Sequence, residues 1–365
     1  MILHLYFARR FALSLLMIAG VLTALVVLVD LFDQTRRFSE FDIGLARLAG
    51  LTLLNVPETL DQMLPLVVIL GTISLFLSLA RSSELVVTRA TGRSAMRALL
   101  SPVIVALTIG VFGTTTLGPI VAATSKRYAT LADGYRSGGI SALSVSADGL
   151  WLRQGDTSGQ TVIRAARSNA DASVLYDVTF VAYARDGGPA RRIEAASAAL
   201  RDGAWSLRDA KVWPLAAGLN PEATAVVHDI LKVESTLTLD RIRESLGTPT
   251  GVSIWDMPEF IAQLEQAGFS ARKHEVWLQS QLARPLFLVA MVLVAAAFTM
   301  RHTRFGGTGT AVLAAVLLGF SLYFVRSFAQ ILGENGQIPV LLSAWAAPFA
   351  ATFLGLGLLL RTEDG

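Results

Sequence analysis

Charged side chains occur at one depth of the apolar stretches of this 365-residue chain, and their types suggest binding chemistry. Arg36 and Arg37 follow the first apolar run, and Arg326 lies about 24 Å along the fifth if that run is helical. A guanidinium binds phosphate oxygens through two parallel hydrogen bonds, and a charge inside a membrane is costly unless it binds or pairs. We therefore predict that Asp33, Arg36, Arg37 and Arg326 form a site for an anionic lipid head group. Arg326 could instead reach the interface or pair with an aspartate. The other charged residues at this depth are Asp30, Glu58 and Asp61.

No motif for catalysis or metal binding occurs in the sequence. The glycine-rich stretch 304–310 lacks the lysine that a phosphate-binding loop requires, and no GxSxG nucleophile elbow is found. The histidines are scattered without the spacing of metal ligands; they are His4, His228, His274 and His302. We predict that the chain is not an enzyme and binds no cofactor or metal itself.

The composition indicates an integral membrane protein. Hydrophobic residues make up 53% of the chain and charged residues only 16%, and the mean hydropathy is +0.54. The formal net charge of +3 says little by itself, and no nucleic-acid partner is expected. The absence of cysteine excludes a disulfide framework and thiolate chemistry.

Six apolar runs are long enough to cross a bilayer as helices. Three of them precede a polar region and three follow it: 11–29, about 51–80, about 98–123, near 282–300, 310–332 and 338–360. The first could be a signal peptide, but it is long and lacks a clear cleavage site, so we favour an uncleaved anchor. Pro57 and Pro65 lie in the second run and predict kinks.

The polar region alternates short strand patterns with turn signals, which is typical of a β-sandwich or jelly roll. The predicted strands are 149–154, 161–167, 174–185, 190–201 and 204–215. In the last of these the alternation changes phase after Asp209, which predicts one bent position. A helix is predicted within 251–275, with Asp256 as its cap and Pro258 in its first turn.

The predicted fold is therefore an α-helical membrane protein with six transmembrane helices, three plus three, and an inserted all-β, jelly-roll-like domain. Residues 1–124 form the first three helices, residues 125–275 the β domain with its connecting helix, and residues 276–365 the last three helices. The apolar strand residues could line an open groove for acyl chains or fill a packed core, and we expect the groove. They are Trp151, Val162, Leu175, Val178, Phe180, Trp205 and Val212.

The orientation follows from the distribution of arginines near the ends of the apolar runs. With a cytoplasmic N-terminus, that side receives nine arginines: Arg9, Arg10, Arg81, Arg89, Arg93, Arg97, Arg301, Arg304 and Arg361. The short loops opposite contain only Arg36, Arg37 and Arg47. Both termini are thus predicted to be cytoplasmic and the β domain periplasmic.

A charged interruption separates the second and third apolar runs. Ser82 or Ser83 could cap a helix with Glu84 in its first turn, and Gly92 could end that helix in a left-handed conformation. We predict a short helix over 82–92. An ordinary basic connecting loop remains the alternative.

The residues of three segments resemble the permease subunits of the lipopolysaccharide export transporter, the LptF/LptG family. The segments are LVDLFDQTRRF (28–38), LLNVPETLDQMLP (53–65) and SELVVTRATGRS (83–94), and the first and third are closer to the G-type subunit than to the F-type. The resemblance follows the order of segments along essentially the whole chain. It differs at Asp30, where the family pattern has a basic residue.

The resemblance implies a non-catalytic subunit of the bacterial inner membrane that extracts lipopolysaccharide and passes it to a periplasmic bridge. Its partners would be a sister permease, the bridge proteins and a dimeric cytoplasmic ATPase, which uses the ATP and Mg²⁺. The segment after the second span would be the coupling helix that contacts the ATPase; its residues are Glu84, Leu85, Val86, Arg89, Ala90 and Gly92. The basic residues after the first span, Arg36 and Arg37, would contact the lipid.

Small residues recur every four positions in the fifth apolar run, at Ala311, Ala315 and Gly319. Such a stripe lets another helix approach closely, and the resemblance favours an interface with the sister permease. Packing within this subunit stays equally open. Two other classes also stay open: a solute carrier, which would show an internal repeat and polar residues at midplane, and a membrane-anchored periplasmic adaptor without a transport cycle.

Overall fold

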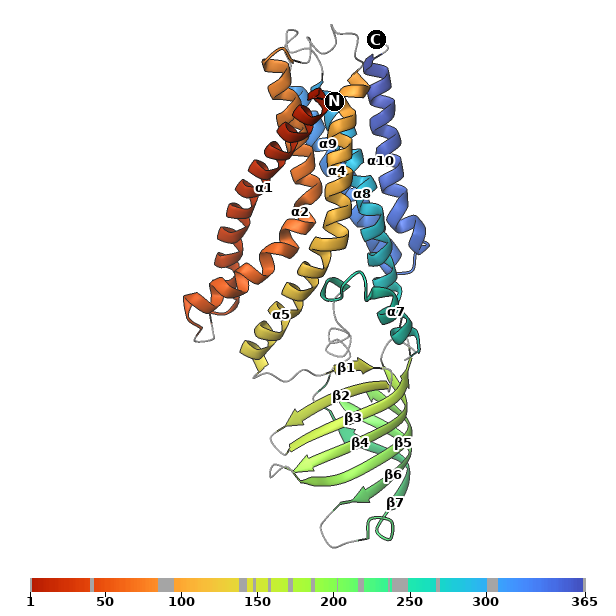
Figure 1. Cartoon of the computed structure of the whole chain (residues 1–365). Helices are drawn as coiled ribbons and strands as arrows, with labels where there is room; N and C mark the ends of the chain where they lie inside the picture. Colours follow the sequence, from red (N-terminus) through yellow and green to blue (C-terminus); the bar gives the residue numbers. More distant parts are fainter. Residues whose placement is uncertain are drawn as a thin grey trace. The chain divides into compact units, whose positions relative to one another are not determined.

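The computed structural model describes fourteen stretches of the chain: residues 2–39, 43–84, 95–137, 143–146, 149–156, 159–169, 173–184, 188–201, 203–215, 220–235, 237, 249–266, 270–300 and 308–363. The chain forms two compact units. One comprises Met1–Tyr128, Val252–Trp255 and Arg272–Gly365, and the other comprises Ala129–Gly251 and Asp256–Ala271. The first unit is helical and the second contains a β-sheet (Figure 1).

Six helices of the described chain are long and apolar enough to cross a membrane, which confirms the predicted number and the three-plus-three order. Figure 1 labels the helices that form these spans. Their bounds are α1 (Ile2–Arg37), α2 (Leu45–Arg81), α4 (Ala95–Phe112) continued by η1 (Gly113–Leu117) and α5 (Gly118–Ser137), α8 (Arg272–Thr299), α9 (Thr308–Glu334) and α10 (Val340–Glu363).

Two helices extend well beyond their apolar runs. α1 continues past Val29 to Arg37, and the third spanning helix continues past Ala123 to Ser137. Hydropathy detects only residues that suit hydrocarbon, whereas Gln, Lys and Arg sustain a helix in water equally well. The charged residues near position 33 therefore lie on the last turns of α1.

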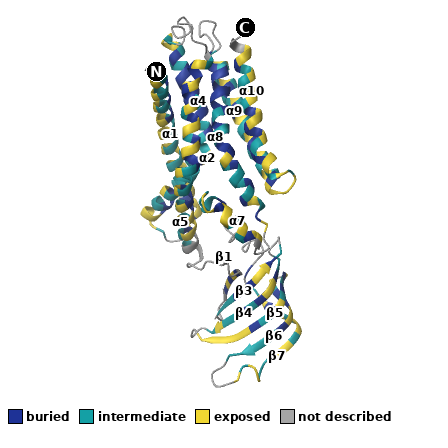
Figure 2. Ribbon diagram, turned by 45° about the vertical axis from the view of Figure 1, so that its right-hand side comes forward, coloured by how far each residue is buried: buried dark blue, intermediate teal, exposed yellow. Residues whose placement is uncertain are grey.

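α8 is the centre of the helical unit. In its most apolar window 72% of residues are buried, against 11% for α1 and α9; Figure 2 shows the same contrast in colour. Close approach requires glycine at two neighbours: a Cβ at Gly110 of α4 would lie 2.6 Å from the Cα of Pro285, and one at Gly355 of α10 would lie 2.8 Å from the Cβ of Leu293. α4 and α10 thus pack directly against the α8 backbone.

The proline in α8 leaves a backbone carbonyl without its helical donor, and a side chain of η1 lies in place of that donor. Pro285 has no N–H for the carbonyl of Gln281, four residues earlier. The Thr114 hydroxyl donates to that carbonyl at 3.2 Å. Thr114 lies in the π-helical turn η1, where the indole of Trp255 donates to the Thr115 carbonyl at 3.1 Å.

The β unit contains one seven-stranded antiparallel sheet in which each strand pairs with the next in sequence. Its strands are β1 (Leu143–Ser146), β2 (Gly149–Asp156), β3 (Gly159–Ser168), β4 (Val174–Ala184), β5 (Pro189–Arg201), β6 (Ala204–Pro214) and β7 (Val226–Glu234). β1 and β7 are the two ends of the strand order, so the sheet is not closed as a barrel. The inserted all-β domain is confirmed, in the form of one open sheet rather than a two-sheet sandwich.

Five strands match the predicted ones, and the two edge strands were missed. β1 has only four residues, too few to show an alternating pattern. In β7 the apolar side chains Val226, Val227 and Ile230 are exposed by 51%, 67% and 65%, so the apolar residues do not follow a one-sided period of two.

The predicted bend in β6 is confirmed, and it belongs to a line across the sheet. Asp209 has φ of +53°, and Asp177 in β4 has φ of +52°, both in the left-handed region that Asp tolerates. Along each of β3, β4, β5 and β6, the alternation of buried and exposed side chains shifts by one residue. The four shifts lie opposite one another, and the pairing register is the same immediately before and after them. The sheet therefore bends along a single transverse line.

The predicted groove is wrong at its central positions, because these residues fill a packed core. Leu175, Val178, Phe180 and Trp205 are at most 1% exposed. They pack in one cluster with residues of α7 (Met257–Gln266), the helix predicted after Asp256. Trp151 lies at 38% exposure beside the guanidinium of Arg164, outside that cluster.

The packed core gives a direct test. Phe180→Asn should destabilise the β unit by about 3–5 kcal/mol, because it removes a buried ring and buries an amide. Hydrogen exchange of the full-length protein should show loss of protection in β4 and β5. Tyr176→Asn, at a 39% exposed position of the same strand, should leave protection nearly unchanged. If protection were unchanged in the Phe180 variant, the packed core would be contradicted at this position and the groove would again be the better interpretation.

Candidate functional site

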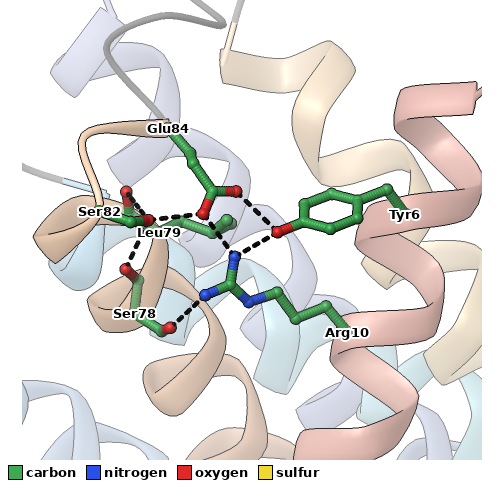
Figure 3. Close-up of polar contacts among 6 residues, drawn as sticks. All are labelled: Tyr6, Arg10, Ser78, Leu79, Ser82 and Glu84. Atoms are coloured by element: carbon green, nitrogen blue, oxygen red, sulfur yellow. Dashed lines mark hydrogen bonds and ion pairs between the residues drawn. The ribbon is translucent and has the colours of Figure 1, made fainter.

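The polar contacts of the helical unit include a network where the start of α1 meets the end of α2 (Figure 3). Arg10 donates from Nη1 to Glu84 Oε1 at 2.7 Å and to the Tyr6 hydroxyl at 2.6 Å, and from Nη2 to Ser78 Oγ at 2.7 Å. Tyr6 donates onward to Glu84 Oε2 at 3.0 Å. Both oxygens of one carboxylate are thus held by α1, with Ser82 as a further donor at 2.7 Å.

The network keeps Glu84 ionised. Partial burial alone would raise the pKa of the Glu84 carboxyl, but the hydrogen bonds from Arg10, Ser82 and Tyr6 outweigh it and hold the pKa below its ordinary value. Glu84 and Arg10 are 33% and 28% exposed, so solvent screens their attraction less than at an open surface.

The chain turns sharply between α2 and Glu84. Ser82 is the C-cap of α2, and its hydroxyl lies 3.0 Å from the Ser78 carbonyl, so it completes the preceding helix instead of starting a new one. Ser83 follows with φ of +57°, a left-handed conformation that costs a serine about 1 kcal/mol or more. This turn directs the Glu84 side chain back towards α1.

The rest of the predicted coupling helix lies outside the described residues. It comprises Leu85, Val86, Arg89, Ala90 and Gly92. A cavity of about 450 Å³ opens beside the described part of the network, and it is lined by Arg10, Ser74, Leu77, Ser78, Arg81 and Ser82.

At its other end α1 presents the predicted lipid-binding residues. Arg36 is exposed, and Arg37 forms an ion pair with Asp33 at 3.7 Å while donating to the Tyr128 hydroxyl at 3.3 Å. These three side chains lie within two turns of helix. Asp33 therefore orients Arg37 without burying it, because the Asp33 side chain is 57% exposed and the Arg37 side chain 47% exposed.

Asp30 and Gln34 attach this end of α1 to neighbouring helices. Asp30 accepts a hydrogen bond from Asn55 of α2 at 2.6 Å, and the buried amide of Gln34 contacts the Tyr128 hydroxyl at 2.9 Å. Asp30, which departs from the family pattern, thus serves in packing between α1 and α2.

Arg326 is not brought together with Arg36 and Arg37 by any contact among the described residues. It is 9% exposed within the helical unit, where it donates to the Ser280 carbonyl at 3.3 Å and stacks 4.9 Å from the centroid of Phe287. Pairing with an aspartate, the alternative considered for Arg326, is made instead by Arg284.

Arg284 of α8 binds Asp61 of α2 twice. Its Nη2 lies 2.7 Å from the Asp61 carboxylate and also donates to the Asp61 backbone carbonyl. That carbonyl would normally accept from residue 65, which is a proline without an N–H. One guanidinium therefore satisfies both the charge of Asp61 and the carbonyl that Pro65 leaves free.

Several residues of these clusters were not predicted, although the sequence contained signals for some of them. Arg284 is a lone cation just inside the fourth apolar run, which marks an intramembrane charge that needs a partner. Tyr6 and Arg10 are four residues apart, a spacing that places them on one helix face. The contacts of Tyr128 and Asn55 have no local signal.

The small residues of α9 lie inside this subunit. Ala315 is fully buried, and a Cβ at Gly319 would lie 2.0 Å from Ile69 Cδ1 and near Met291. Ala311 is half-buried on the same helix. Ala315 and Gly319 thus lie inside this subunit, with Gly319 packed on α2 and α8, and the exposed face of α9 carries Leu313, Leu317, Phe320, Phe324 and Phe328.

No group of three or more potential metal ligands occurs among the residues that the structure describes.

The chain from residue 5 to residue 361 matches the family of lipopolysaccharide export system permeases LptF/LptG. The chain belongs to this family. It is 24% identical over 371 aligned positions to the lipopolysaccharide export system permease protein LptG of Escherichia coli strain K12, with 99% of this chain and 98% of that protein covered. It is 23% identical over 317 positions to LptG of Haemophilus influenzae, covering 87% of this chain and 86% of that protein.

The LptF/LptG assignment agrees with the fold, since six apolar helices with an antiparallel sheet between the third and fourth are present. The named relatives are permeases of a lipopolysaccharide export system, which agrees with a multi-pass membrane protein. Both relatives bear the LptG name, in line with the G-type motifs.

The buried Arg284–Asp61 pair should be essential for stability of the helical unit. Arg284→Gln leaves an unpaired buried carboxylate and should lower the free energy of unfolding by about 3–5 kcal/mol. Asp61→Asn combined with Arg284→Gln should recover part of the loss, because no charge is left unpaired. Thermal melting of the purified protein measures both, with Arg47→Gln at an exposed position as the control. Equal melting of the single variant and the control would contradict the assignment.

Proposed function

We propose that this chain is the permease subunit of an ABC-type transporter that extracts lipopolysaccharide from the outer leaflet of the bacterial inner membrane. The observation that carries the proposal is the family match over residues 5–361, which includes both ends of the helical unit. One end presents Glu84 on an ordered turn, and the other presents exposed guanidinium groups at Arg36 and Arg37.

The arrangement of charges supports an orientation with both termini in the cytoplasm. α1 begins and α10 ends at the same end of the helical unit (Figure 1), where Arg9, Arg81 and Arg361 are exposed. Arginines near the ends of spans are retained on the cytoplasmic side. Arg36 and Arg37 then face the periplasmic leaflet, and the β domain is periplasmic.

Lipid recognition rests on Arg36 and Arg37, with Asp33 as the residue that orients Arg37. Exposed guanidinium groups can grip phosphates of an anionic lipid bidentately. Arg326 contributes to the same site when the helices around α8 separate, because in this structure its guanidinium is enclosed by Ser280 and Phe287.

The proposed partners follow from two features: the sequence has no catalytic motif, and the described spanning helices expose apolar faces. ATP hydrolysis belongs to a separate dimeric cytoplasmic ATPase that contacts the coupling segment 82–92, and the lipid passes to periplasmic bridge proteins. The sister permease covers the exposed apolar faces of the spanning helices. α1 alone leaves Leu16, Met17, Leu28 and Phe32 between 69% and 75% exposed, consistent with burial by lipid or by another subunit.

Reversal of charge at Glu84 tests the ATPase contact. Glu84→Lys places a cation beside Arg10 and removes the anion offered to the partner, so the ATPase should no longer copurify or should hydrolyse ATP without lipid export. Copurification and ATP-dependent lipid release from membranes are the measurements. Glu259→Lys, an exposed position in α7, is the matched charge change. Normal assembly and export by the Glu84 variant would remove this residue from the role.

Photo-crosslinking tests the lipid contact. A photoreactive residue in place of Arg36 or Arg37 should form adducts with lipopolysaccharide in cells, and one in place of Arg326 should do so only while the transporter turns over. An exposed control position, Arg47, should give few adducts. Adducts at Arg47 as abundant as those at Arg36 and Arg37 would count against a specific site.

A further inference from the structure

Tyr6 and Arg10 lie one helical turn apart on α1 and hold the two oxygens of the Glu84 carboxylate. Arg10 also binds Ser78 on the last turns of α2, so one guanidinium joins α1, α2 and the segment that follows α2 (Figure 3). This link lies in the first turns of α1, far along that helix from Arg36 and Arg37.

α1 is suited to carry motion along its length. Its 36 residues form one helix without proline, whereas α2 contains Pro57 and Pro65. From Arg10 to Arg37 the rise is about 40 Å at 1.5 Å per residue. A displacement imposed at Arg10 therefore reaches Arg37 through an unbroken ladder of backbone hydrogen bonds.

The two halves of α1 are attached differently. Near the network Phe7, Phe11 and Leu15 are at most 5% exposed and pack in the main core cluster. The outer half presents Val21, Leu25 and other side chains at more than half exposure. It is attached by side-chain hydrogen bonds to Asn55 and Tyr128, which are individually weak and can exchange.

We propose that Arg10 is a positioning residue that couples the Glu84 segment to α1, so that ATPase-driven movement of this segment shifts α1 and with it Arg36 and Arg37. This rests on the proposed function, since it names the helix that receives the ATPase motion. Tyr6 supports the coupling by binding the second oxygen of the same carboxylate. α1 then transmits movement from the cytoplasmic ATPase to the lipid site.

The test uses the full transporter in lipid bilayers. The chain contains no cysteine, so spin labels at Leu28→Cys and Leu100→Cys report only the distance between α1 and α4 once partner cysteines are replaced. Both positions are more than half exposed, which keeps the labels out of the core. The distance is measured with and without a non-hydrolysable ATP analogue, and lipid extracted per ATP hydrolysed is measured in parallel.

We expect the nucleotide-dependent change of distance to disappear in Arg10→Gln and the lipid extracted per ATP to fall about tenfold, the size of effect that loss of one charge-assisted hydrogen bond produces. Tyr6→Phe keeps the ring and removes one bond, so it should give a smaller loss even if Arg10→Gln assembles poorly. Arg9→Gln, an exposed neighbour, should behave like the wild type.

The outcomes separate this inference from the proposed function. A nucleotide-dependent shift of α1 that persists in Arg10→Gln and in Tyr6→Phe, with normal lipid yield, overturns the coupling through Arg10 and leaves the permease function intact. A wild-type complex without ATP-dependent lipid extraction overturns the proposed function, and the coupling with it.

Discussion

The helical unit depends on the need to satisfy polar groups where no water is available. A carbonyl or charge left unpaired in hydrocarbon costs several kcal/mol, so each helix break must be repaired by a neighbour. α2 and α8 each contain a proline near their middle, and each freed carbonyl has a side-chain donor from another helix: Arg284 for Asp61 and Thr114 for Gln281. These contacts connect α2 to α8 and α8 to η1, which continues α4, so the kinks add specific contacts between helices.

The same constraint explains the placement of the remaining charges. Arg284 and Asp61 compensate one another inside the unit, whereas Arg36, Arg37 and Glu84 lie at helix ends. Arg326 is also enclosed, beside the Ser280 carbonyl and the Phe287 ring, and it shares the electrostatic surroundings of Arg284 and Asp61. Keeping such a cation buried is costly, and the negative charge of Asp61 offsets part of that cost.

In the β unit, a single open sheet has to enclose a cluster of apolar side chains. The sheet bends along one line through β3 to β6, and two aspartates in the left-handed conformation make that bend possible at β4 and β6. The phase change keeps apolar residues on the same face on both sides of the bend. Trp205 and Phe180 then pack edge to face, with ring centroids 6.1 Å apart, and α7 covers the cluster.

The sequence by itself determined the number and order of the spanning helices, five of the seven strands and the bend at Asp209, because local period and hydropathy encode which residues face water. The family motifs also predicted roles for Glu84 and for the arginines after the first span, and these roles stay predictions. Only the tertiary structure decided which partners these residues have. Glu84 meets Arg10 across 74 positions and Arg284 meets Asp61 across 223, and no local pattern specifies such pairs. Burial of Phe180 and Gly319 was also undecided, since an apolar face looks the same in sequence whether its own chain or another molecule covers it.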